Sequence, residues 1–224
     1  MIAEAGTAHA GDVEAACFLV KTAVNAGCDV IKFQAFDDPE SMMFCWIDGD
    51  KERCKRWEKS RIGYEGWSKV KDFADAHGIK LMFSCFENAT IGWAEGLRLP
   101  CMKVASRAAA SFPWDLWNGP VLVSDGMWRP NAQEVARLPE RVAMMQCTAE
   151  YPAEVPWRGH LPGYSAHSKD PFLAIDAIRN GAVFVEVHFQ VDEYDAGPDD
   201  PVSLYPFELV TVCEARDYYY KNSY

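Results

Sequence analysis

The chain has 224 residues, of which 49% are hydrophobic and 25% are charged, and its formal net charge is −11 at pH 7. A chain of this length can bury a full hydrophobic core, so residues 1–224 are predicted to form a single domain. The negative charge argues against nucleic acid or an anionic membrane as a partner. The eight cysteines show no CxxC or zinc spacing, and neither a secretion signal nor a membrane-length apolar run is present. We therefore expect a cytoplasmic protein with reduced thiols.

Eight short apolar segments recur along the chain, and most of them end in polar or charged residues. They are 2–6, 30–34, 81–85, 102–106, 121–125, 142–147, 163–167 and 184–189. Nearly continuous apolar strands that alternate with helices are typical of a parallel sheet buried on both faces. Eight of them predict a compact α/β fold, a closed (β/α)8 TIM barrel, whose active site lies at the carboxyl ends of the strands. Because 224 residues are few for this fold, we expect some helices to be shortened or replaced by loops.

Helices are predicted between the strands. Asp12 can cap a helix over 13–26 that Gly27 ends, and similar patterns predict helices over 64–77 and 169–180. A short helix over 131–138 and a last helix over 207–220 complete the set.

Two long stretches interrupt this alternation. Residues 37–61 follow the second strand and contain Cys45, Trp46, Cys54 and Trp57, and the proline-rich stretch 150–161 stands where the sixth helix is expected. At the catalytic end of a barrel, long loops commonly serve as lids or binding loops. The alternative for 37–61 is an insertion without a role.

Acidic residues and histidines lie at the ends of neighbouring strands. His167 and His188 end the seventh and eighth strands, where two imidazoles could share one divalent cation; the alternative is a pair of satisfied core histidines. Glu4 and Glu186 end the first and eighth strands, which are neighbours in a closed barrel. Buried carboxylates are costly unless they are paired or coordinated, so both are candidate site residues, with structural acids bonded to loop amides as the alternative.

Lysines inside otherwise apolar strands form a second set of candidates. Two ammonium groups and several hydroxyls that converge from different strands would neutralise a phosphate and a carboxylate together. The set comprises Lys32, Lys103, Ser106, Ser124 and Ser165, with Gln34 as an additional member.

Eight motifs, in this order and at this spacing, resemble the barrel domain of the sialic acid synthase (NeuB) family. They are Ile2-Ala-Glu-Ala-Gly-Thr-Ala-His9-Ala-Gly11, Ile31-Lys-Phe-Gln-Ala-Phe36, Lys103-Val-Ala-Ser106, Ser124-Asp-Gly-Met127, Gln146-Cys-Thr-Ala-Glu-Tyr-Pro152, Gly163-Tyr-Ser-Ala-His167, Glu186-Val-His-Phe189 and Gly197-Pro-Asp199. The resemblance extends to about Glu208. It implies condensation of phosphoenolpyruvate with the aldehyde of an amino sugar or another aldose, which gives a 2-keto-3-deoxy sugar acid.

The resemblance also implies roles for individual residues. His167 and His188 would hold a divalent metal, Mn first with Mg or Co as alternatives. The strand lysines and serines would hold phosphoenolpyruvate, and Ser84 or Cys85 would add a hydroxyl or thiol. Catalytic roles would fall to Glu4, Lys103 and Glu186, and substrate contacts would include Glu150 and Tyr151. The expected partners are phosphoenolpyruvate, a sugar aldehyde and a second copy of the chain in a homodimer.

Departures from the family pattern concentrate at the sugar-binding positions. Ala108 stands where a carboxylate is expected, Glu150 where many members have asparagine, and Ala166 where they have an acid. Full-length members also carry a C-terminal antifreeze-like domain that contributes an arginine to the sugar, and we expect this chain to lack that domain. Arg107 or the stretch 37–61 is a candidate to fill the role instead. Three alternatives therefore stay open: a different aldose as acceptor, another metal-dependent barrel lyase or aldolase, and a catalytically silent barrel kept for binding.

Overall fold

The computed structural model describes residues 1–42, 51–191 and 197–221, except for the side chains of residues 41, 51–54 and 132. Cys45 and Trp46 of the predicted lid lie outside the described residues, as does the side chain of Cys54. In the part of the chain that is described, no helix combines the length and the apolar character needed to cross a bilayer.

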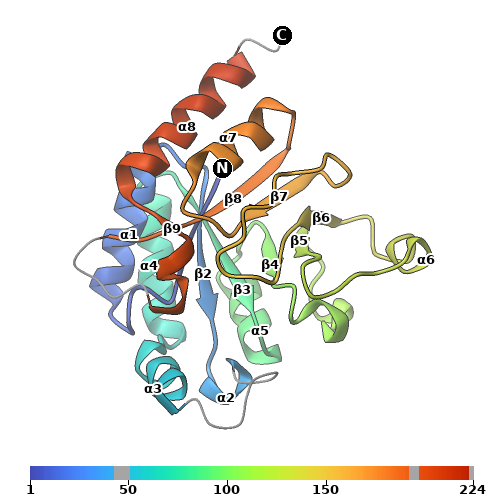
Figure 1. Ribbon diagram of the computed structural model, residues 1–224. Helices are drawn as coiled ribbons and strands as arrows, with labels where there is room; N and C mark the ends of the chain where they lie inside the picture. The colour runs from blue at the N-terminus through green and yellow to red at the C-terminus, as the bar shows by residue number, and fades with distance from the viewer. Residues whose placement is uncertain (43–50, 192–196, 222–224) are drawn as a thin grey trace.

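Eight parallel strands close into a barrel, because the first strand pairs with both the second and the eighth (Figure 1). They are β1 (Ile2–Gly6), β2 (Val30–Ala35), β3 (Lys80–Cys85), β4 (Met102–Val104), β5 (Val121–Ser124), β6 (Val142–Gln146), β7 (Gly163–Ala166) and β8 (Phe184–Phe189). The predicted (β/α)8 barrel is confirmed. A ninth strand that the sequence did not predict, β9 (Ser203–Leu204), pairs with the carboxyl end of β8.

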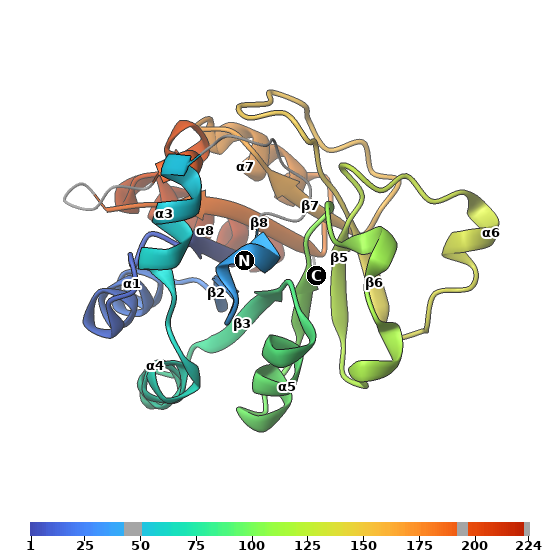
Figure 2. The same cartoon turned by 90° about the horizontal axis from the view of Figure 1, so that it is seen from below.

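The helices surround the barrel unevenly. The long ones are α1 (Val13–Asn25), α4 (Tyr64–Ala76), α5 (Asn88–Gly96), α7 (Pro171–Arg179) and α8 (Pro206–Lys221). Beside β4, β5 and β6 the connections are short 3-10 helices, η1 (Ala109–Ser111) and η2 (Trp114–Leu116), and the one-turn helix α6 (Ala132–Val135) (Figure 2). The predicted shortening of some helices is therefore confirmed. As predicted, the Asp12 side chain caps α1, accepting from Glu14 N at 2.7 Å, and Gly27 ends it at a φ of 85°.

The stretch 37–61 contains helices, whereas a long loop was expected. It holds α2 (Pro39–Met42) and α3 (Lys51–Ser60). Trp57 of α3 is buried with Phe36 and Met42 in a small apolar cluster apart from the main core. Because α3 is mostly charged and Trp57 is its one large apolar residue, no helical hydrophobic period was visible there in the sequence.

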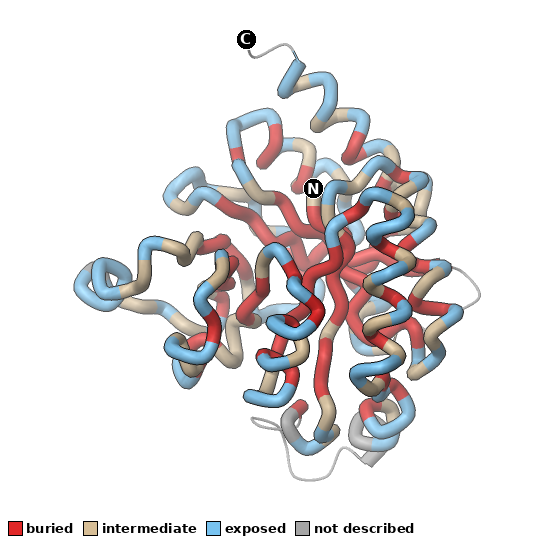
Figure 3. Tube along the Cα trace, turned by 180° about the vertical axis from the view of Figure 1, so that it is seen from behind, coloured by how far each residue is buried: buried red, intermediate tan, exposed pale blue. Residues whose placement is uncertain are grey.

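The core has two layers, which follow from the alternation of side chains along each strand. Outward-facing strand residues such as Ile31, Phe83 and Val187 belong to the main cluster, which also includes buried residues of α1 and α4 (Figure 3). A separate apolar cluster of Ile2, Met82, Leu122 and Met145 also contacts Val30, Cys101, Ala143 and Phe184. Because these residues alternate with the outward-facing ones, this second cluster fills the amino-terminal part of the barrel interior.

Candidate active site

Polar side chains line the barrel interior directly above this apolar cluster. Two residues after seven of these eight apolar residues, all but Ala143, the chain presents a residue that lines a pocket. The pairs are Ile2 with Glu4, Val30 with Lys32, Met82 with Ser84, Cys101 with Lys103, Leu122 with Ser124, Met145 with Cys147 and Phe184 with Glu186. A period of two keeps both members of each pair on the same face of the sheet. The pocket therefore opens at the carboxyl ends of the strands, as the fold predicts.

Every predicted site residue except Glu150 lines this pocket. Those that do are Glu4, Lys32, Gln34, Ser84, Lys103, Ser106, Ser124, Tyr151, Ser165, His167, Glu186 and His188. Glu150 is exposed and outside the lining. Ser84 is the pocket residue of the Ser-Cys pair, because its hydroxyl accepts from Lys32, whereas the Cys85 thiol lies 3.4 Å from the carbonyl of Thr90 in α5.

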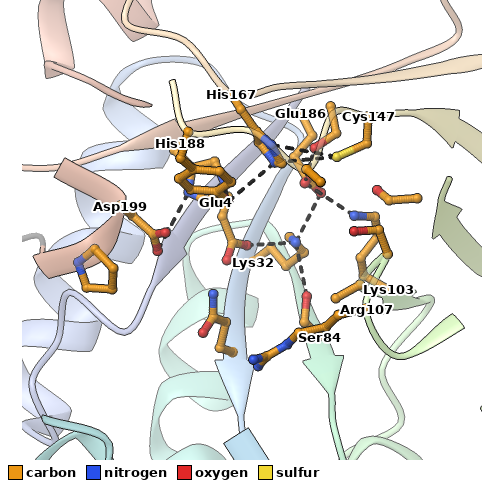
Figure 4. Close-up of a pocket in the computed structure, with 18 of the residues that line it drawn as sticks. Glu4, Lys32, Ser84, Lys103, Arg107, Cys147, His167, Glu186, His188 and Asp199 are labelled. Atoms are coloured by element: carbon orange, nitrogen blue, oxygen red, sulfur yellow. Dashed lines mark hydrogen bonds and ion pairs between the residues drawn. The ribbon is translucent and has the colours of Figure 1, made fainter. Parts of the chain in front are cut away.

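Buried ion pairs join the four charged strand residues. Lys32 Nζ lies 2.9 Å from Glu4 Oε2 and 3.1 Å from Glu186 Oε2, and it donates to Ser84 Oγ at 3.0 Å. On the other carboxylate oxygen of Glu186, Lys103 Nζ donates at 3.3 Å and Ser165 Oγ at 2.7 Å (Figure 4). All four charged side chains are at most 5% exposed, so their charges are held by one another and not by solvent.

The two carboxyl groups differ in acidity because their surroundings differ. Burial would raise the pKa of Glu186, but Lys103 and Lys32 outweigh it and hold this pKa well below its usual range. Burial raises the pKa of Glu4 to about 7, with Lys32 opposing the shift. Glu186 is therefore ionised at neutral pH, whereas Glu4 is poised to exchange a proton. Pairs of acids separated in this way commonly divide acid–base roles.

The same buried charges shift the pKa values of the two lysines in opposite directions. Burial lowers the pKa of Lys103, and Glu186 only partly opposes this. For Lys32, Glu186 and Glu4 outweigh burial and raise the pKa above its usual value. Lys32 is thus a permanent cation at neutral pH.

His167 and His188 face each other beside this cluster, with their ring centroids 5.5 Å apart. His167 Nδ1 lies 2.6 Å from the carbonyl of Thr148, which can only accept, so this nitrogen carries the proton and Nε2 presents its lone pair. The Tyr151 hydroxyl lies 3.4 Å from Nε2 of His167 and 3.3 Å from Nε2 of His188. The two Nε2 atoms therefore converge on one point in the pocket.

Both imidazoles are neutral at pH 7. Burial lowers the pKa of His167 to about 4, and burial together with His167 lowers the pKa of His188 well below its ordinary value. Neutral imidazoles are good ligands for first-row divalent metals. Within residues 1–42, 51–191 and 197–221, no group of three or more His, Cys, Asp or Glu side chains is arranged as a metal site.

Several pocket residues were not assigned a role from the sequence. Asp199, in the Gly-Pro-Asp motif, places Oδ2 3.8 Å from His188 Nδ1, and a side chain on Gly6 would meet this carboxylate at 2.5 Å. Cys147 lies 3.5 Å from His167 Nε2, and burial raises its thiol pKa to about 11. Arg107 and Trp57 also line the pocket. The motif order marked Asp199 and Cys147, and the long stretch 37–61 marked Trp57. Arg107 stood out only as a candidate for the arginine that the C-terminal domain supplies in full-length members.

Comparison with known proteins identifies the family. Residues 19–158 and 156–221 match the NeuB family. The N,N'-diacetyllegionaminic acid synthase of Campylobacter jejuni is 25% identical, over 95% of this chain and 74% of its own length. The N-acetylneuraminate-9-phosphate synthase of Drosophila melanogaster is 28% identical, over 96% of this chain and 66% of its own length.

Solved structures agree on the fold. The N-acetylneuraminic acid synthetase of Leptospira borgpetersenii superposes with a TM-score of 0.82 at 23% identity, covering 98% of this chain and 83% of that one. The chain spans about two thirds to three quarters of the length of the two relatives named above. The barrel, the order of its motifs and the family match agree, and the chain belongs to the NeuB family.

Proposed function

We propose that this chain condenses phosphoenolpyruvate with an aldose or amino-sugar aldehyde to give a 2-keto-3-deoxy sugar acid. The observation that carries the proposal is the composition of one pocket. Lysines and serines suited to a phosphorylated acid adjoin two neutral imidazoles and two carboxyl groups of different acidity. The names of the relatives, which are synthases of nonulosonic acids, support the same chemistry.

Binding of phosphoenolpyruvate falls to the lysine side of the pocket. Ser106, Ser124 and Ser165 would donate to its phosphoryl group with Lys103, while Lys32 would lie near its carboxylate. The hydroxyl of Ser124 is buried and, among the described residues, has no oxygen or nitrogen partner and only the weakly bonding thiol of Cys147 beside it, which leaves it available to a ligand. Water-excluded, preorganised donors of this kind stabilise charge as it moves during a reaction.

His167 and His188 would hold a divalent metal, with Mn proposed first and Mg or Co as alternatives. Their converging Nε2 atoms and neutral state fit such an ion. When bound, the metal would supply Lewis-acid polarisation of the aldehyde oxygen. Asp199 would orient the His188 ring through Nδ1.

In the proposed reaction, C3 of phosphoenolpyruvate forms a bond to the aldehyde carbon, and protonated Glu4 gives its proton to the aldehyde oxygen. Water then adds at C2 and returns one proton to Glu4. The C2–O bond to phosphate breaks as the keto group forms, and the proton of the C2 hydroxyl leaves with the phosphate. Glu186 stays ionised, and through its pairs with Lys32 and Lys103 it fixes both ammonium groups. A group with a pKa near 7 is suited to such two-way proton transfer.

A screen for inorganic phosphate tests the proposal. Purified protein, phosphoenolpyruvate and Mn²⁺ should release phosphate only when a suitable aldose is present, and the panel should include simple aldoses as well as amino sugars. Because several sugar-binding positions depart from the family, poor activity with N-acetylmannosamine is expected. Phosphate release that ignores the aldose would exclude a condensation, and no release with any aldose would favour the silent-barrel alternative.

A further inference from the structure

The charges that line the pocket are balanced without a ligand. Lys32 and Lys103 are already paired with Glu186, and Lys32 also with Glu4. Asp199 adds a third carboxyl group to the lining. A phosphate ester carries about −1.5 to −2 charges at neutral pH, and a carboxylate adds one more. The paired lysines alone therefore cannot neutralise phosphoenolpyruvate, whose binding the proposed function requires.

Arg107 is the one other lysine or arginine among the described residues that line this pocket. It directly follows Ser106, in the loop after β4. Figure 4 shows Arg107 on the side of the pocket where Ser84 and Lys103 lie, and Asp199 with His188 on the opposite side. Arg107 and Lys103 thus lie on one side of the pocket and Asp199 with His188 on the other, while Lys32 lies between Glu4 and Ser84.

The guanidinium of Arg107 is held in place by neighbouring residues. Nη1 donates to the carbonyl of Met42 at 2.9 Å, and Nη2 lies 3.5 Å from the Met42 sulfur. Cζ stands 4.3 Å from the centroid of the Phe86 ring, just after β3. Cation–π contact and a carbonyl acceptor fix a guanidinium while leaving its positive charge intact. Arg107 is therefore a preorganised cation at the edge of the pocket.

We propose that Arg107 clamps the phosphoryl group of phosphoenolpyruvate, as a specificity residue added to the serines and Lys103. The phosphoryl group is the better match than the carboxylate, because Arg107 directly follows Ser106 and lies on the same side of the pocket as the Ser84 hydroxyl. A guanidinium also suits the geometry of phosphate oxygens. This placement of the phosphoryl group then directs C3 of phosphoenolpyruvate toward the imidazole side, where the aldehyde would bind. This inference rests on the proposed function.

Calorimetric titration of three probes tests the clamp without requiring turnover. The probes are phosphoenolpyruvate, inorganic phosphate, and pyruvate, which keeps the carboxylate but lacks the phosphoryl group. Arg107→Gln removes the charge and retains an amide donor for Met42. Arg107→Lys retains a positive charge but lacks the planar set of N–H donors of a guanidinium. Arg179→Gln, on an exposed position of α7, is the matched control. Urea unfolding of each variant shows whether the fold is intact.

The expected result is selective. Arg107→Gln should weaken phosphoenolpyruvate and phosphate by roughly 10- to 100-fold, the range for a charge-assisted contact. It should leave pyruvate unchanged, and Arg107→Lys should fall between. Arg179→Gln should bind all three probes like the wild type.

Three results would overturn the clamp. Phosphoenolpyruvate affinity could be unchanged in Arg107→Gln, or pyruvate could weaken by the same factor, or inorganic phosphate could bind as tightly as to the wild type. Failure of the proposed function looks different. The wild type would then bind phosphoenolpyruvate through Arg107 and yet release no phosphate with any aldose. Wild-type protein that binds neither phosphoenolpyruvate nor phosphate would refute both.

Discussion

Replacing Glu186 with glutamine tests whether the buried ion pairs are organised as described. The carboxylate is 2% exposed, forms an ion pair with Lys32 and accepts from Lys103 and Ser165. Glutamine keeps the size and an acceptor for Ser165 but removes the charge. Lys32 keeps Glu4 at 2.9 Å, whereas Lys103 loses the carboxylate with which it pairs.

The cost can be bounded from the geometry. Removing one partner of a buried ion pair destabilises a protein by about 3–5 kcal/mol, because the other charge is left uncompensated. In a chain of 150–250 residues each kcal/mol shifts Tm by about 2–4 °C, so Glu186→Gln should melt roughly 6–20 °C below the wild type. Burial already lowers the pKa of Lys103, so loss of Glu186 should lower it further.

Urea and thermal unfolding at pH 7 measure this effect, with exposed Glu214→Gln on α8 as the control expected to stay within about 0.5 kcal/mol. Adding Lys103→Met should recover part of the loss, because the unpaired ammonium is gone. The pKa of Lys103 is lower in the folded chain than in the unfolded chain. Between these two pKa values the unfolded state binds more protons, so the stability of the folded state rises with pH. The deficit of Glu186→Gln should therefore shrink from pH 7 toward pH 10. A variant within about 1 kcal/mol of the wild type would refute the description.

Three other predictions concern single residues. Glu4 has a pKa of about 7 in the folded state, so above pH 4.5 the folded state binds more protons than the unfolded state and the wild type loses stability as the pH rises. Glu4→Gln should therefore gain stability relative to the wild type between pH 5 and 7, by at most about 1.4 kcal/mol per pH unit in denaturant titrations. A stability difference that does not change with pH would contradict this. His188→Ala should abolish Mn²⁺ uptake measured by elemental analysis while circular dichroism stays native, and retained metal would remove His188 from the site. Gly6→Ala should lower the free energy of unfolding in urea by about 1–3 kcal/mol, because φ is 56° and the new methyl would meet Asp199 at 2.5 Å. Gly92→Ala in α5, which has open space around it, is the control and should be neutral or stabilising.

The site residues on strands could be predicted because the barrel fixes their placement. Once a strand such as 184–189 is recognised, the alternation of side chains puts Glu186 and His188 on the inner face, and closure of the barrel puts Glu4 beside them. The ion pairs themselves were not predicted. Lys32 and Lys103 were interpreted as ligand-binding cations, and the structure shows that each already has a carboxylate partner.

Loop residues were harder to place because no periodicity constrains them. Glu150 belongs to the same motif as Tyr151, yet only the tyrosine reaches the pocket. The stretch 37–61 was interpreted as a loop, since the three buried residues Phe36, Met42 and Trp57 are too far apart in sequence to show a helical period. Arg107 was considered only as a substitute for the arginine of the C-terminal domain, and its contacts with Met42 and Phe86 depend on how the stretch 37–61 folds.

Carbon-13 NMR tests the central claim most directly. Wild-type protein is incubated with Mn²⁺, phosphoenolpyruvate labelled at C3, and the responsive aldose labelled at C1. The proposed condensation predicts one-bond coupling between the two labelled carbons in the product, together with an equal amount of inorganic phosphate, and loss of both in Glu4→Gln. Phosphate released without carbon–carbon coupling would contradict the account, as would coupling that persists at the wild-type rate when Glu4 is replaced.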